Sequence, residues 1–237
     1  MAPILLNADM GESFGIYSFG NDEALMGIVD AANIACGFHA SDFNHMRETV
    51  RLARMHGVLV GAHVSLPDLQ GFGRREMKMP RDELANCILY QIGALTAFLK
   101  AEKVELHHIK PHGVLYGMAA RDAEVAHAIA DAAEVYGVPV FGLPGTQQEA
   151  VFTERGIPMF AEFFPDLDYD AEGRLLIVKK APDTPPPLAA DRTRAVLAHG
   201  IPLSGGAHAS VETLCIHSDR GNAVAVAQAV ADAIASA

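Results

Sequence analysis

Short apolar runs alternate with longer amphipathic segments along most of the chain. Between the apolar runs, hydrophobic residues recur at helical spacing, as Phe43, Met46, Val50 and Ala53 do. We predict seven strands, at residues 4–8, 33–35, 59–61, 105–109, 140–143, 159–163 and 213–217. We predict helices at about residues 22–29, 43–56, 84–101, 125–136 and 147–155. Gly137 is expected to end the fourth of these, and Asn222 to cap a last helix that follows it. This alternation indicates an α/β fold with a mostly parallel sheet.

Polar side chains follow six of the seven predicted strands. A closed barrel brings all carboxyl ends of its strands to one mouth, whereas an open sheet leaves some at its edges. We therefore predict one seven-stranded parallel β/α (TIM-like) barrel over residues 1–237, with an irregular, proline-rich excursion at about 164–190. Within it, residues 174–180 could form a strand, and the four prolines of 182–187 argue against regular structure.

Composition limits the classes of partner. The net charge of −11 argues against nucleic acid or an anionic membrane surface as a partner, and no apolar run approaches the ~20 residues of a membrane span. The three cysteines are scattered and suggest neither a zinc pair nor a disulfide framework. The chain has no G-x-G-x-x-G after its first strand and no P-loop motif. With no basic leader at its start, we expect a cytoplasmic protein.

The strand ends carry ionisable groups suited to catalysis. Asp9 and Glu12 follow the first strand, and His39 and His63 follow the second and third. Asp9, His39 and His63 make a plausible two-His, one-carboxylate metal set, although the histidines could equally be hydrogen-bonded supports.

A second group of polar residues comes from later in the chain. Lys110 could neutralise a carboxylate, a phosphate or an oxyanion, or it could be a structural partner of Glu162 or Asp9. His112 beside it is a candidate general base. The guanidinium pair Arg74 and Arg75 suits carboxylate or phosphate recognition. The remaining candidates around the mouth are Glu162, Asp166, His217, Ser218 and Asp219.

Five ordered motifs resemble the LamB/YcsF family, to which the A subunit of 5-oxoprolinase belongs. They are L-N-A-D-M-G-E-S-F-G (residues 6–15), A-N-I-A-C-G-F-H-A (32–40), G-A-H (61–63), P-D-L-Q-G-F-G-R-R (67–75) and K-P-H-G (110–113). The resemblance implies a barrel of the glycoside hydrolase/deacetylase type. It also implies a part in the ATP-dependent opening of 5-oxoproline to glutamate, together with 5-oxoprolinase subunits B and C.

The residues and the resemblance together suggest roles. Since the chain shows no nucleotide motif, we expect the partners to activate the lactam with ATP and this chain to bind or hydrolyse it. Asp9 or His112 would deprotonate water, and Lys110 and His63 would stabilise the oxyanion. Substrate-binding residues would be Asn7, Glu12, Asn33, His39, Arg74, Arg75, Glu162, His217 and Asp219.

Two alternatives remain open from the sequence. One is a metal-dependent deacetylase or amidohydrolase that acts on another small cyclic amide through Asp9, His39 and His63. The other is a non-catalytic subunit that holds the ligand for partner enzymes.

Overall fold

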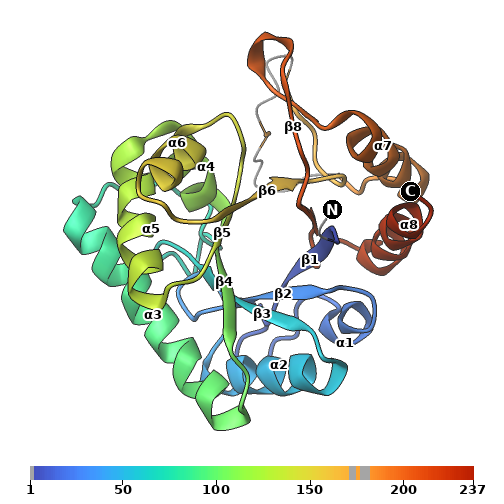
Figure 1. The fold of residues 1–237 in the computed structure, drawn as a ribbon. Helices are drawn as coiled ribbons and strands as arrows, with labels where there is room; N and C mark the ends of the chain where they lie inside the picture. Colours follow the sequence, from blue (N-terminus) through green and yellow to red (C-terminus); the bar gives the residue numbers. More distant parts are fainter. Residues whose placement is uncertain (1–2, 171–174, 177–181) are drawn as a thin grey trace.

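Seven parallel strands close into a barrel in a computed structural model that describes residues 3–170, 175–176 and 182–237 (Figure 1). Neighbouring strands follow one another along the chain, and the last strand pairs with the first. The barrel strands are β1 (Leu5–Met10), β2 (Ala31–Ala35), β3 (Leu59–Val64), β4 (Leu106–Pro111), β5 (Val140–Gly142), β6 (Met159–Phe163) and β9 (Thr213–Ile216). The predicted fold class is confirmed.

Helices surround the barrel, and the two at the C-terminal end pack side by side (Figure 1). Between β6 and β9 the chain adds a two-stranded antiparallel hairpin and a short 3-10 turn. The helices are α1 (Asp22–Met26), α2 (Phe43–His56), α3 (Arg81–Glu102), α4 (Gly113–Arg121), α5 (Ala123–Tyr136), α6 (Gln147–Glu154), α7 (Pro186–His199) and α8 (Ala223–Ala235). The hairpin consists of β7 (Ile201–Pro202) and β8 (His208–Ala209), with the turn η1 (Ser204–Gly206) between them.

The core lies between the barrel and its helices. All five residues of β2 are buried, as expected for a parallel strand with both faces covered. Helix α3 buries Leu84, Ile88, Ile92 and Leu95, and each such side chain contributes about 1.5–3 kcal/mol when fully buried. The length and hydropathy of α3 would suffice to cross a membrane, but these apolar side chains pack against the barrel and neighbouring helices instead.

Local signals explain where several helices begin and end. The Asp42 side chain accepts hydrogen bonds from the backbone of Asn44 and His45 at the start of α2. Gly137 has a left-handed φ of 64° directly after α5, as predicted for a helix terminator.

Two predictions at helix starts were wrong. Pro186 and Pro187 form the first turn of α7, because a proline in that turn has no backbone hydrogen bond to lose. Asn222 precedes α8, but its side chain does not cap the helix; it donates to the carbonyl of Thr184 at 2.8 Å.

Other segments were either not predicted or lie mostly outside the described residues. Helices α4 and α7 were not predicted. Most of the strand suggested at residues 174–180 lies outside the described residues, and Leu175 within it forms a single antiparallel bridge to Tyr169.

Candidate functional site

A cavity of about 930 Å³ opens at the carboxyl ends of the barrel strands. Strands β1, β3 and β4 are longer than predicted, so Asp9, His63 and Lys110 are strand residues and not loop residues. Side chains on adjacent strands of a closed barrel converge at its mouth. Ionisable residues that line the cavity are Asp9, Glu12, His63, Arg74, Lys110, His112, Asp183, His217, Asp219 and Arg220.

A buried ion pair forms the floor of the cavity. Lys110 Nζ lies 3.1 Å from Asp9 Oδ1 and 3.3 Å from Glu162 Oε1, and only 2% of the lysine is exposed. Lys110 Nζ also lies 2.7 Å from Cys215 Sγ and over the Phe164 ring, 5.2 Å from its centroid. An ammonium with this many close partners is fixed in position.

Two asparagines and a histidine hold this ion pair from inside the barrel. Asn33 Nδ2 donates to Asp9 Oδ1 at 2.9 Å and to Asn7 Oδ1 at 2.7 Å. Asn7 Nδ2 in turn donates to Glu162 Oε1 at 2.9 Å. His108 lies 2.6 Å from Asn33 Oδ1, and its ring occupies the space that a side chain at Gly61 would fill. The floor is therefore a connected, buried polar network.

The network keeps both members of the ion pair charged. Burial alone would raise the pKa of Asp9, but His63 and Lys110 outweigh it and hold that pKa well below the usual value. Burial alone would lower the pKa of Lys110, but the carboxylates of Asp9 and Glu162 raise it well above the usual value. At neutral pH the cavity floor therefore presents a carboxylate beside an ammonium.

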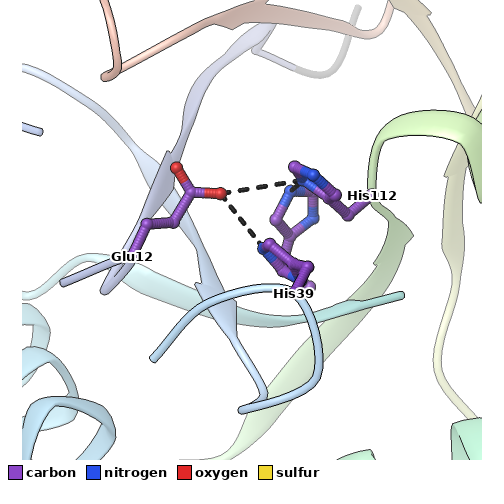
Figure 2. Close-up of side chains that lie close together, drawn as sticks. Glu12, His39 and His112 are labelled. Atoms are coloured by element: carbon purple, nitrogen blue, oxygen red, sulfur yellow. Dashed lines mark hydrogen bonds and ion pairs between the residues drawn. The ribbon is translucent and has the colours of Figure 1, made fainter. Parts of the chain in front are cut away.

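A second cluster, formed by Glu12, His39, His63 and His112, lies beside the ion pair. Glu12 Oε1 is 3.1 Å from His39 Nε2 and 3.7 Å from His112 Nδ1 (Figure 2). His112 Nδ1 is 2.9 Å from His63 Nε2, and the His39 and His112 rings stack with centroids 3.7 Å apart. One ligand atom from each of the four residues lies within 4.8 Å of the others. We call this group the Glu12 cluster, and its donor set suits a divalent metal ion.

The loops around the Glu12 cluster leave no room for larger residues. Gly73 has a φ of 62°, and a side chain there would collide with His112, His39 and Ser65. Its carbonyl accepts a hydrogen bond from the backbone N–H of Val114 at 3.1 Å. The G-F-G-R and K-P-H-G motifs are therefore packed against each other.

Burial controls the charge of the Glu12 cluster. It lowers the pKa of His39 and of His112 well below the usual value, so both rings are neutral at pH 7. Burial, together with the charges of Asp9 and Asp219, raises the pKa of Glu12 well above its usual value. Neutral imidazole is the form in which histidine binds metals.

Another part of the cavity combines basic side chains with carboxylate partners. His217 Nδ1 lies 3.0 Å from Asp166 Oδ2, and the His217 backbone N–H donates to the same oxygen at 2.9 Å. Burial alone would lower the pKa of His217, but Asp166 raises it. Arg220 lies nearby, 3.8 Å from Asp166, and Arg74 pairs with Asp219 at 3.0 Å. This region, which we call the His217 end, is suited to an anionic group.

Comparisons with known proteins agree with this geometry. The family model of the LamB/YcsF family matches residues 4–237. The chain belongs to the LamB/YcsF family. It is 47% identical over 240 residues to a Thermus thermophilus protein named as the A subunit of 5-oxoprolinase, covering 98% of this chain and 96% of the relative.

Two further relatives of this LamB/YcsF protein carry lactam-related names. A lactam utilization protein lamB from Emericella nidulans is 53% identical over 184 residues, which cover 76% of this chain and 72% of the relative. The crystal structure of a lactam utilization protein from another strain of Thermus thermophilus superposes with a TM-score of 0.90 at 44% identity, covering 99% of this chain and 96% of that one.

The predicted site residues of this LamB/YcsF chain fall into three groups by their position relative to the cavity. Eight of them line the cavity: Asp9, Glu12, His63, Arg74, Lys110, His112, His217 and Asp219. Four are buried behind the lining and contact it: Asn7, Asn33, His39 and Glu162. Arg75 is not brought to the cavity, because it pairs with the buried carboxylate of Asp68 and its side chain is 59% exposed.

The residues of the metal set also differ from the prediction. Sequence reasoning grouped Asp9 with His39 and His63, whereas the structure groups Glu12 with His39, His63 and His112. Asp9 remains next to this group, with Oδ2 3.2 Å from His63 Nε2.

Sequence reasoning assigned no role to three residues that contribute to the site. Cys215 contacts Lys110 across the barrel, and Phe72 supplies the carbonyl that faces His112. Asp166, although noted at the mouth, was given no function there. The available signals were the sequence C-I-H-S-D at residues 215–219 for Cys215 and the G-F-G-R of residues 71–74 for Phe72.

Proposed function

We propose that this chain is the A subunit of an ATP-dependent lactam hydrolase that opens 5-oxoproline to glutamate. The observation that carries the proposal is the buried Asp9–Lys110 pair, which faces a cavity whose other end presents the basic side chains of His217, Arg220 and Arg74. 5-Oxoproline has matching groups, namely a lactam carbonyl and a carboxylate. The names of the relatives support the same substrate.

ATP has a physical reason to enter this reaction. An amide in an unstrained lactam is a poor electrophile, and phosphorylation of its oxygen makes the carbonyl carbon more reactive. The sequence has no P-loop and no dinucleotide fingerprint. We therefore assign the ATP-dependent activation to partner subunits B and C, and the ring opening to the cavity of this chain.

The residues at the floor of the cavity have complementary roles in this proposal. Lys110 donates to the oxygen on which negative charge develops, since its ammonium is fixed by Asp9 and Glu162 before the reaction. Asp9 orients the attacking water and accepts its proton. The water oxygen bonds to the carbonyl carbon of the O-phosphorylated ring, the water proton passes through Asp9 to the ring nitrogen, and the C–N bond breaks to leave an amine and an acyl phosphate. A second water molecule hydrolyses the acyl phosphate to glutamate and inorganic phosphate.

The cavity also has room for an activated intermediate. Its volume of about 930 Å³ is at the upper end of the range that is usual for small-molecule sites. A phosphorylated lactam, which is larger and more anionic than the free lactam, would place its carboxylate at the His217 end, where Arg74 and Arg220 also line the cavity.

Reconstitution tests the proposed function. The purified chain is mixed with its B and C partners, 5-oxoproline and ATP, and glutamate and ADP are measured. We expect glutamate only from the full mixture. Full-rate turnover by this chain alone would contradict the division of labour. No glutamate from folded, associated subunits would contradict the substrate, and a panel of other lactams would follow.

A further inference from the structure

Backbone carbonyls fix the orientation of two histidines in the Glu12 cluster. His63 Nδ1 lies 3.0 Å from the carbonyl oxygen of Lys110, and His112 Nε2 lies 2.8 Å from that of Phe72. A carbonyl oxygen only accepts hydrogen bonds, so each of these ring nitrogens carries the hydrogen. The other nitrogen of each ring, His63 Nε2 or His112 Nδ1, is therefore the atom that can bind a metal ion.

These two nitrogens lie 2.9 Å apart in a buried space. Asp9 Oδ2 lies 3.2 Å from His63 Nε2. Glu12 Oε1 approaches from the side of His112 and His39 (Figure 2). Imidazole nitrogens and a carboxylate oxygen that converge in this way are the ligands that proteins offer to a zinc-type ion.

His39 provides an independent observation. It is 1% exposed, and within the part of the chain that the structure describes its Nδ1 has no hydrogen-bond partner while Nε2 faces Glu12. A buried polar atom without a partner is costly, and it marks a place where a bound ligand would reorganise the hydrogen bonds.

We propose that the Glu12 cluster binds one divalent transition-metal ion of the zinc type through Glu12, His39, His63 and His112. Two ligands about 2.1 Å from one tetrahedral ion lie about 3.4 Å apart. Three of the separations in the cluster are 2.9, 3.1 and 3.7 Å, and all lie within 4.8 Å, so small side-chain shifts would close the four ligands around one ion. Three nitrogen donors and one oxygen select such an ion over Mg²⁺ or Ca²⁺, which prefer oxygen ligands. The backbone carbonyls behind His63 and His112 orient these rings, as hydrogen-bond partners usually do for metal-bound histidines.

The position of the site gives the ion access to a ligand in the cavity. Glu12, His63 and His112 line the cavity, whereas His39 is buried behind them. An ion held here would have one side toward the cavity, where a substrate oxygen or a water molecule would bind as a fifth ligand. This inference concerns the cavity of the proposed function but does not depend on which lactam, if any, is opened there.

Metal binding to the tag-free full chain tests the inference. The protein is stripped with a chelator, dialysed, and titrated by calorimetry with Zn²⁺ and, separately, Mg²⁺; bound metal is counted by elemental analysis. We expect one Zn²⁺ per chain and no Mg²⁺ binding at the same concentrations. Co²⁺ in place of Zn²⁺ should give visible ligand-field bands that report nitrogen and oxygen ligands.

Two variants and a matched control locate the ion. Glu12→Gln and His112→Asn should each weaken Zn²⁺ binding at least tenfold, whereas His56→Asn, at the exposed end of α2, should bind like the wild type. Circular dichroism confirms that each variant is folded, and Zn²⁺ should raise the melting temperature of the wild type but not of Glu12→Gln. Wild-type protein that binds no stoichiometric Zn²⁺, or variants that bind as tightly as the wild type, would overturn the proposal. Activity of the proposed complex plays no part in this test.

Discussion

Lys110 on β4 contacts residues from strands on the far side of the barrel. Its Nζ lies within 3.3 Å of atoms of Asp9 on β1, Glu162 on β6 and Cys215 on β9. The sequence predicted either a catalytic lysine or a structural partner of Asp9 or Glu162. The structure shows that one lysine can contact both carboxylates and still line the cavity, so the two interpretations are compatible.

His217 allows a prediction of pH dependence. Its pKa is raised by Asp166, so its positive charge persists above the usual pKa near 6.5 and disappears as the pH rises through the raised value. If the His217 end binds the substrate carboxylate, KM should increase over that pH range while kcat changes less. Steady-state kinetics of the reconstituted complex at a series of pH values measure this.

Asp166 provides the control for this pH effect. Asp166→Asn removes the charge that raises the pKa of His217, so the increase in KM should begin at a lower pH. In His217→Gln, KM should be high and nearly independent of pH over the same range. A pH profile that is the same in all three proteins would show that His217 does not bind the carboxylate.

At the scale of elements, the sequence predicted what depends on local patterns. All seven barrel strands were located, α2 followed from its hydrophobic spacing, and the end of α5 followed from Gly137. Helix α4 was missed because it starts at Gly113 with no side-chain cap and follows β4 after a single residue. Helix α7 was missed because the four prolines before and in its first turn suggested irregular chain, although Pro is favourable at the first helical position.

The cap of α2 gives a stability prediction. Asp42 accepts hydrogen bonds from the backbone of Asn44 and His45 and also from Gly15, at 2.7 Å. Asp42→Ala should lower the free energy of unfolding by about 0.5–2 kcal/mol, measured by urea denaturation. Glu48→Ala on the exposed face of the same helix should change it by less. Equal effects of the two substitutions would contradict a specific capping role for Asp42.

At the scale of the whole molecule, barrel closure assembles the site. Asn7 and Glu162 are 155 residues apart in sequence and 2.9 Å apart at their hydrogen-bonded atoms. Hydrophobic periodicity predicts the strands and their parallel order but not which side chains meet across the barrel. For this reason the mouth was predicted correctly as a region, whereas the partners of Lys110 and the place of Glu12 in the histidine cluster came only from the structure.

The same barrel closure separates the cavity into functional parts. The Asp9–Lys110 pair occupies the floor, the Glu12 cluster one side and the His217 end another. The central claim is that ring opening takes place on this floor while partners consume ATP. A change at the floor should therefore affect glutamate formation more than assembly of the complex.

The most direct measurement is the rate of glutamate formation by the reconstituted complex that contains Lys110→Gln, with Lys100→Gln on the exposed surface of α3 as the matched control. Glutamine retains hydrogen-bond donors but removes the charge, so the folded complex should form, as chromatography and thermal melting can verify. We predict a rate lower by about 10²–10³-fold for Lys110→Gln, the loss typical of a removed oxyanion donor, and an unchanged rate for the control. A folded Lys110→Gln complex that forms glutamate at the wild-type rate would contradict the account.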